Sequence, residues 1–264
     1  MHIATPDGQA LHVVDRGAGT PILLVHGFPL DHTMWRGQID DLSQTFRVIA
    51  PDLRGFGESG VAETDTLTMD RHANDLHALL DALNITEPVV LCGLSMGGYV
   101  AFRFLETCAE RLQALVLCDT RPAADAPEGA ETRKRMAAEV LRDGPQPALD
   151  AMLPKLVSKK TMAERPGVLE RLREIIVGTD RRSIAAALHG MAQRPDSTPL
   201  LSGISVPTLV VCGEEDALTP AYVMRAMAGK IPGAQYVEIP AAGHMAPMED
   251  PATVNAAIRA FLER

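Results

Sequence analysis

The chain has 264 residues, of which 46% are hydrophobic and 22% are charged, and its formal net charge is −9. This length suits one large domain, with or without an insertion, and the negative charge argues against a nucleic-acid-binding surface. No apolar run is long enough to span a membrane and the first residues show no signal peptide, so we expect a cytoplasmic protein.

Strand-like and helix-like segments alternate over the first 118 residues. A turn at Asp7-Gly8 predicts an opening hairpin whose second strand covers residues 9–15. Further strands are expected at 21–27, 46–51, 89–92 and 113–118, with helices at 35–42, at 68–84 and after residue 98. The run 21–27 shows no polar alternation, which is typical of a strand covered on both faces. Strands that alternate with helices predict a mostly parallel sheet.

The segment from Val89 to Gly97 joins a short apolar strand to the pattern G-x-S-x-G, and a helix follows. A serine on such a tight turn adopts a backbone conformation that is costly for a residue with a Cβ. Its neighbours two positions away therefore need almost no side chain. Gly93 and Gly97 meet this need, although the bare pattern also occurs by chance in loops rich in glycine and serine. The context predicts a nucleophile elbow with Ser95 as the nucleophile.

The residue pattern of the sequence changes after Asp119. Helix-forming stretches at 128–142, 146–156, 168–177 and 182–193 are separated by breaks that contain proline, without any β-branched run. Strands at 206–212 and 235–239 then alternate with helices at 220–230 and 250–263. We therefore expect a core domain made of residues 1–120 and 200–264, with residues 121–199 as an all-helical insertion.

A serine hydroxyl needs a nearby base, and histidine has a pKa near working pH. His244 lies in a glycine-containing loop just past the expected strand 235–239, at a sheet edge where loops carry chemistry. We predict His244 as the base, the alternative being a structural loop histidine. His26 is interpreted as a structural brace. Solvent exposure is expected for the histidines of the hairpin and of the helix 68–84, namely His2, His12, His72 and His77.

The acid that orients this histidine is expected at the end of a strand. Glu214, Glu215 and Asp216 follow the strand that ends at residue 212. Asp216 is preferred because Thr219-Pro220 begins a helix three residues later. Asp119 is the competitor, since it also ends a strand.

An oxyanion hole requires two amides that point at one spot. One is expected from Met96, at the start of the helix after the elbow. The other is expected from Phe28, in the loop after the strand 21–27, where Gly27 allows the bend.

The sequence carries only weak signals for a cofactor or a metal ion. Residues 55–60 match G-x-G-x-x-G, but a polar stretch at 61–68 follows where a dinucleotide fold would begin its helix. The four cysteines form no C-x-x-C pair, which suits buried thiols in a reducing compartment. We predict neither a cofactor nor a metal ion.

The strongest motifs are found together along nearly the whole chain. They are His26-Gly27-Phe28-Pro29, Pro51 to Ser59, Gly93 to Gly98, Gly213 to Asp216 and Gly243-His244. In combination they resemble the α/β-hydrolase superfamily, whose triad follows the order Ser95, Asp216, His244. Within it the chain is similar to cofactor-free carboxylesterases close to the oxoadipate enol-lactonases. The resemblance implies a helical cap at 121–199 and hydrolysis of short-chain or aryl esters.

We therefore predict an α/β-hydrolase fold with an eight-stranded, mostly parallel sheet and helices on both faces. The predicted function is that of a serine carboxylesterase that forms an acyl-serine, with a small-molecule ester and water as substrates. Alternatives on the same triad are a lactonase, a carbon–carbon bond hydrolase, and an acyltransferase or perhydrolase. A non-catalytic ligand-binding receptor is the remaining alternative from another class.

Overall fold

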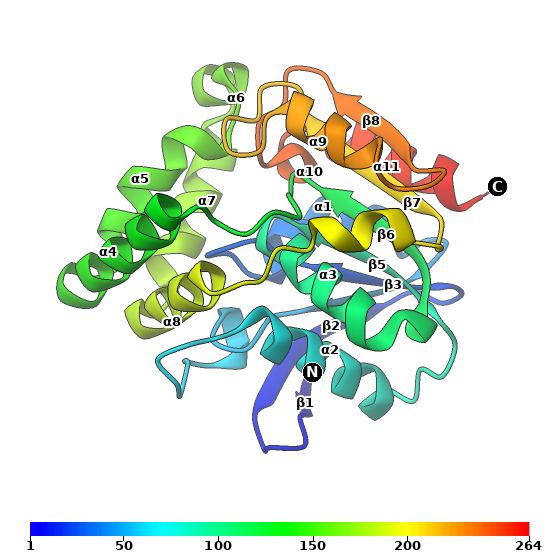
Figure 1. Ribbon diagram of the computed structural model, residues 1–264, viewed down its shortest axis with the longest axis horizontal. Helices are drawn as coiled ribbons and strands as arrows, with labels where there is room; N and C mark the ends of the chain where they lie inside the picture. Colours follow the sequence, from blue (N-terminus) through cyan, green and yellow to red (C-terminus); the bar gives the residue numbers. More distant parts are fainter. Residues whose placement is uncertain (264) are drawn as a thin grey trace.

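Eight strands form one sheet within residues 1–263, the part of the chain that this computed structural model describes (Figure 1). They are β1 (His2–Ala4), β2 (Ala10–Arg16), β3 (Pro21–Val25), β4 (Arg47–Pro51), β5 (Val89–Leu94), β6 (Leu112–Cys118), β7 (Thr208–Gly213) and β8 (Gln235–Ile239). Their spatial order is β1-β2-β4-β3-β5-β6-β7-β8. β2 pairs antiparallel with β1 and β4, and all later pairings are parallel. The predicted eight-stranded, mostly parallel sheet and the opening hairpin are confirmed.

Helices cover both faces of the sheet. α1 (Arg36–Leu42) and α11 (Pro251–Leu262) share a core with one face, and α2 (Met69–Ala82), α3 (Met96–Cys108) and α9 (Ala221–Ala228) share a core with the other. In β3, Ile22 and Leu24 join the first core, whereas Leu23 and Val25 join the second. Because successive side chains of a strand point to opposite faces, a strand between two helical layers is apolar throughout.

The described chain between β6 and β7 is largely helical. It contains α4 (Pro127–Asp143), α5 (Gln146–Leu156), α6 (Lys159–Glu164), α7 (Pro166–Gly178) and α8 (Arg181–Ala192), followed by the 3-10 turn η4 (Thr198–Gly203). In Figure 1 these helices lie together beside one end of the sheet, coloured green to yellow-green. The sequence did not predict α6, because six residues are too few to show an apolar period. Its start is marked by Ser158, whose side chain accepts a hydrogen bond from the amide of Thr161 at 3.2 Å.

The parallel strands bring the predicted site residues to one edge of the sheet. β3, β5, β6, β7 and β8 run in the same direction, so their carboxyl ends meet there. The loops or turns after these strands carry, in the same order, Phe28, Ser95, Asp119, Asp216 and His244. The short helix α10 (Ala246–Glu249) begins two residues after His244.

Three further 3-10 turns complete the described chain, namely η1 (His32–Trp35), η2 (Gly57–Ser59) and η3 (Ala109–Arg111). Among residues 1–263, no helix combines the length and the apolar character that crossing a membrane requires.

Candidate active site

Ser95 lies on the turn between β5 and α3 with φ 52° and ψ −110°, a conformation that residues with a Cβ rarely adopt. Such a conformation costs about 1–3 kcal/mol and persists only where the surroundings impose it. The amide of Ser95 donates to the carbonyl of Cys118 at 3.0 Å, and the hydroxyl of Thr120 donates to the carbonyl of Ser95 at 2.7 Å. The end of β6 therefore holds the turn in place.

The glycines around this turn are required by close backbone approaches. A Cβ on Gly93 would lie 2.4 Å from the carbonyl oxygen of Gly97, and one on Gly97 would lie 2.2 Å from the carbonyl oxygen of Val25. Gly27, which was expected to allow a bend, does not have a positive φ. A Cβ there would lie 2.8 Å from the far end of the Leu94 side chain, which can move aside, so this contact constrains Gly27 less than the backbone contacts constrain Gly93 and Gly97.

Asp216 and His244 form a buried hydrogen-bonded pair. Nδ1 of His244 lies 2.8 Å from Oδ2 of Asp216, and the exposed fractions of His244 and Asp216 are 2% and 5%. Oδ1 of Asp216 accepts the amides of Leu218 and Thr219 at 2.7 and 3.0 Å, and the hydroxyl of Thr219 donates to Oδ2.

The charge of Asp216 fixes the orientation of the imidazole. Burial by itself would raise the pKa of Asp216, but the charge of His244 and the hydrogen bonds from His244 and Thr219 outweigh it and lower the pKa to about 2. The carboxylate is therefore ionised at neutral pH and holds Nδ1 of His244. Nε2 is then the ring nitrogen that another group can use.

The loop that carries His244 is tied to the helical segment. Glu249 is 2% exposed, and its two oxygens accept the amides of Gly243 and Ser158, each at 2.8 Å. The amide of Met245 donates to the carbonyl of Leu156 at 2.9 Å. A Cβ on Gly243 would lie 2.6 Å from the nitrogen of Ser158. The position of His244 is thus set jointly by α10 and by the end of α5.

Two amides have the placement expected of an oxyanion hole. Met96 is the first residue of α3, where helix amides have no partner within the helix, and Phe28 lies in the loop after β3. Among the hydrogen bonds recorded for residues 1–263, neither amide is a donor. His26 braces this loop: its Nδ1 lies 2.9 Å from the carbonyl of Gly27, and its Nε2 accepts the amide of Leu53 at 2.9 Å. Burial lowers the pKa of His26, although the charge of Asp52 opposes this shift.

A cavity of about 460 Å³ opens over these groups. Phe28, Ser95 and His244 all line it, whereas Asp216 lies behind His244. Much of the remaining wall comes from α4, α5 and α8, including Met136, Met152, Leu188 and Met191. No hydrogen bond joins Ser95 to His244 among residues 1–263, and catalytic hydrogen bonds in unliganded sites are often long and shorten only when substrate binds. The predicted nucleophile, base and oxyanion loop therefore face one space.

The family model of the alpha/beta hydrolase fold matches residues 20–251. The chain belongs to this family. It is similar to a thermophilic esterase from Thermogutta terrifontis, solved with malate bound, with 48% identity, a TM-score of 0.97, and 100% and 97% of the two chains covered. It is also similar to the enol-lactonase from Burkholderia xenovorans LB400, with 29% identity, a TM-score of 0.92 and full coverage of both chains.

A curated relative is the dihydrolipoyllysine-residue acetyltransferase component of the acetoin cleaving system of Pseudomonas putida. It is 33% identical over 254 residues, which cover 93% of this chain but only 64% of that protein. The chain therefore spans less than two thirds of this relative.

Asp119, the competing acid, occupies a different place in this alpha/beta hydrolase. It has φ 44°, is fully buried, and its Oδ1 accepts the amide of Gly213 at 2.8 Å, while Oδ2 has no donor among the described residues. Atoms of Asp119, Cys212 and Asp216 lie within 4.8 Å of one another. Burial, and then the charge of Asp216, raise the pKa of Asp119 well above its usual value. Burial and the charge of Asp216 thus favour the neutral form of Asp119, whereas His244 is bonded to Asp216.

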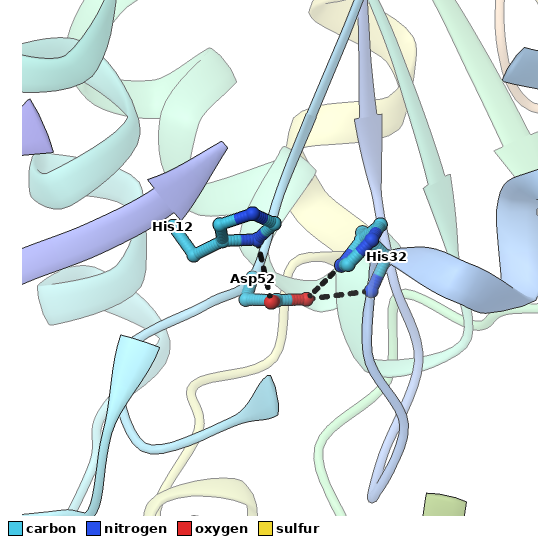
Figure 2. Close-up of side chains that lie close together, drawn as sticks. All are labelled: His12, His32 and Asp52. Atoms are coloured by element: carbon cyan, nitrogen blue, oxygen red, sulfur yellow. Dashed lines mark hydrogen bonds and ion pairs between the residues drawn. The ribbon is translucent and has the colours of Figure 1, made fainter. Parts of the chain in front are cut away.

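A second polar cluster, centred on Asp52, escaped the sequence analysis. Figure 2 shows Asp52 between His12 of β2 and His32 of η1. Nδ1 of His12 is 3.0 Å from Oδ2 of Asp52, and Nδ1 of His32 is 2.8 Å from Oδ1. The backbone amides of His32 and Glu58 donate to the same two oxygens at 2.7 and 2.9 Å. These three residues come from segments about twenty positions apart, so no sequence spacing could indicate their meeting.

Two histidines and an aspartate are residue types that also bind zinc, but in this cluster they hydrogen-bond one another and hold neighbouring segments together. A carboxylate offers about four acceptor positions, and four donors already occupy those of Asp52. Burial would raise the pKa of Asp52, but the hydrogen bond of His32 and the charges of His26 and His32 lower it to about 2. Burial would lower the pKa of His32, but Asp52 outweighs it and raises that pKa.

The predicted exposure of His72 and His12 is wrong. His72 is fully buried and His12 is 9% exposed. Burial, with the charges of His26 and Arg54 next, lowers the pKa of His72 to about 3. Residue 72 lies three positions after Met69 and four before Leu76, on the apolar face of α2, and this spacing was the signal for burial.

Proposed function

We propose that this alpha/beta hydrolase is a serine carboxylesterase that acts through an acyl-serine intermediate. The observation that carries the proposal is a buried, ionised Asp216 bonded to His244, with Ser95 on a strained turn facing the same cavity. The similarity to the thermophilic esterase, at 48% identity over the full chain, supports the same reaction.

The proposed reaction has two halves. Nε2 of His244 takes the proton of Ser95 while the hydroxyl oxygen attacks the ester carbonyl, and the amides of Phe28 and Met96 hold the negative oxygen that forms. Collapse of this intermediate breaks the ester bond, and the alcohol leaves with the proton from His244. Water, deprotonated by His244, then attacks the acyl-serine; the bond between the acyl carbon and the Ser95 oxygen breaks, His244 returns the proton to that oxygen, and the acid is released. Asp216 stabilises the protonated imidazole in both halves.

The role proposed for residues 121–199 is that of a cap over this site. The cavity is lined by side chains of α4, α5 and α8 as well as by the loops of the sheet edge. The helical segment therefore decides which acyl and alcohol groups fit beside Ser95.

A lactonase is the second candidate, favoured by the similarity to the enol-lactonase from Burkholderia xenovorans LB400 at 29% identity. A lactone is an internal ester, so the same triad and oxyanion hole would open it. A comparison of γ- and δ-lactones with linear esters of the same acyl length separates the two activities.

The test of the main proposal is hydrolysis of a 4-nitrophenyl ester series by the wild type and by Ser95→Ala. We expect the substitution to lower kcat by roughly 10⁴-fold or more, because the nucleophile is lost while the fold remains. Ser202→Ala, at an exposed serine outside the cavity, is the matched control and should retain full activity. Hydrolysis by Ser95→Ala at a rate near that of the wild type would refute the proposal.

A further inference from the structure

The cap side of the cavity is built around one acidic residue shared by three arginines. Asp125 accepts hydrogen bonds from Arg121 at 2.8 Å, from Arg194 at 2.9 Å and from Arg133. The side chain of Asp125 is 2% exposed, and that of Arg194 is 3% exposed. Burial would raise the pKa of Asp125, but the hydrogen bonds of Arg194 and Arg133 keep it well below its usual value. Because one carboxylate serves three guanidinium groups, two positive charges remain uncompensated.

These arginines keep unused hydrogen-bond donors. A guanidinium group has five N–H donors, and the Nε atoms of Arg121 and Arg194 are buried without a partner among the described residues. Arg194 is fixed over the ring of Tyr99, with its Cζ 4.1 Å from the ring centre. Arg121, Tyr99 and Arg133 line the cavity that contains Ser95. Arg121 and Arg133 therefore line this cavity as parts of a network that is anchored on Asp125.

Two more charged residues complete this wall. Lys155 of α5 and Glu128 of α4 both line the cavity and are exposed. Neither of them forms an ion pair or a side-chain hydrogen bond recorded for residues 1–263, and their charges cancel each other. The excess positive charge thus persists in a chain whose net charge is −9. A cationic patch in an acidic protein attracts anions to this site specifically.

We propose that the cavity selects esters that carry a free carboxylate at a distance from the ester bond, with Arg121, Arg133 and Lys155 as its partners. This inference rests on the esterase activity proposed above. The ester bond would lie at Ser95, with the phenyl ring of Phe28 and the methionine side chains of the wall around the connecting methylene groups. Arginine suits this task because its planar fork binds a carboxylate through two parallel hydrogen bonds.

The test compares substrates that differ only in charge. Monoethyl adipate places a carboxylate at the far end of the acyl chain, and ethyl adipamate replaces it with a neutral amide of the same shape. A second pair places the same groups on the alcohol side, as the butanoyl ester of 4-hydroxybutanoate and that of its amide. Hydrolysis is followed by proton release, with Ser95→Ala as the blank.

We expect kcat/KM to be about tenfold higher for the carboxylate than for the amide in at least one pair, since charge-assisted hydrogen bonds outweigh neutral ones. The ratio should fall several-fold between about 0.05 M and 1 M salt, because the screening length shortens to about 3 Å. Lys155→Met should lower the ratio about threefold and Lys155→Arg should restore it. Lys160→Met, at an exposed lysine of α6 outside the cavity, makes the same charge change and should leave the ratio unaltered.

The outcomes separate this inference from the proposed function. If Ser95-dependent hydrolysis occurs but the carboxylate is no better than the amide in either pair, the inference is wrong and the esterase proposal stands. The inference is equally wrong if Lys160→Met lowers the ratio as much as Lys155→Met does. If none of these esters nor the 4-nitrophenyl series is hydrolysed, the proposed function fails and this inference fails with it.

Discussion

Replacement of Asp119 by asparagine tests the electrostatics behind the proposed triad. Asp119 is fully buried, its Oδ1 accepts the amide of Gly213, and its pKa is raised by burial and by the charge of Asp216. A neutral carboxyl group can donate a hydrogen bond toward Asp216. Asn keeps the acceptor for Gly213 and offers an N–H in place of the O–H. We therefore expect Asp119→Asn to hydrolyse esters within about threefold of the wild-type rate.

The opposite case, an ionised Asp119, predicts a measurable change in the pH profile of Asp119→Asn. Atoms of Asp119 lie within 4.8 Å of Asp216, and Oδ2 of Asp216 is 2.8 Å from His244. A negative charge about 8 Å from the imidazole would stabilise its protonated form by about 2 kcal/mol at an effective dielectric constant near 20. Its removal would shift the acid limb of the kcat/KM profile to lower pH by about 1.5 units. A neutral Asp119 predicts no shift.

The assay is the pH dependence of kcat/KM for a short aliphatic ester, measured at constant ionic strength for the wild type and Asp119→Asn. A downward shift of the acid limb by one unit or more would refute the reasoning. Asp119→Leu is the companion variant, because it removes the charge and also leaves the buried amide of Gly213 without an acceptor. It should lose about 1–3 kcal/mol of unfolding free energy in urea, a loss that Asn should not show.

Two other substitutions test how the site is held. Glu249→Ala leaves the buried amides of Gly243 and Ser158 unpaired, so the free energy of unfolding in urea should fall by about 2–4 kcal/mol, and kcat should fall because the His244 loop loses its anchor. His32→Gln tests the contact between His32 and Asp52, and the measured quantity is Tm as a function of pH. The pKa of His32 is raised on folding, so its contribution is complete below pH 6.5 and is lost as the pH rises through the folded value. The wild type should therefore lose Tm above pH 6.5 more steeply than His32→Gln does.

Each of these variants has a matched control. Glu170→Ala removes an exposed carboxylate from α7 and should leave both stability and kcat unchanged. His189→Gln removes a histidine of α8 whose recorded hydrogen bond is to the carbonyl of Asp65, and it should keep the wild-type slope of Tm against pH. An unaltered kcat in Glu249→Ala would contradict the anchoring argument. Parallel Tm profiles for the wild type and His32→Gln would contradict the assignment of the pH dependence to His32.

The sequence predicted those features that depend on local pattern and strand order. Ser95, Asp216 and His244 were placed after three separate strands, and parallel strands necessarily bring such positions to one edge of a sheet. Asp119 also follows a strand and satisfied the same rule. The sequence could not decide between Asp119 and Asp216, because both carboxyl groups reach the same edge of the sheet. The side-chain contacts decide, since only the carboxylate of Asp216 bonds His244.

What the sequence missed depends on contacts through space. The four donors to Asp52 come from β2, η1 and the turn η2, and no single segment shows an unusual pattern. The sharing of Asp125 by three arginines was equally hidden, since Arg194 lies 69 positions away from its partner.

The junction between α5 and α10 links the proposed cap to the proposed base. Glu249 bonds Gly243 and Ser158, and Met245 bonds Leu156, so the last turn of α5 and the His244 loop share their hydrogen bonds. A displacement of this end of α5 would therefore move His244 relative to Ser95, which is fixed by β6. In the cavity wall, Arg133 and Met136 of α4 and Met152 of α5 lie outside this junction, whereas Lys155 directly precedes Leu156. Changes in that wall should alter which ester binds, whereas changes at the junction should alter the rate at which any bound ester reacts.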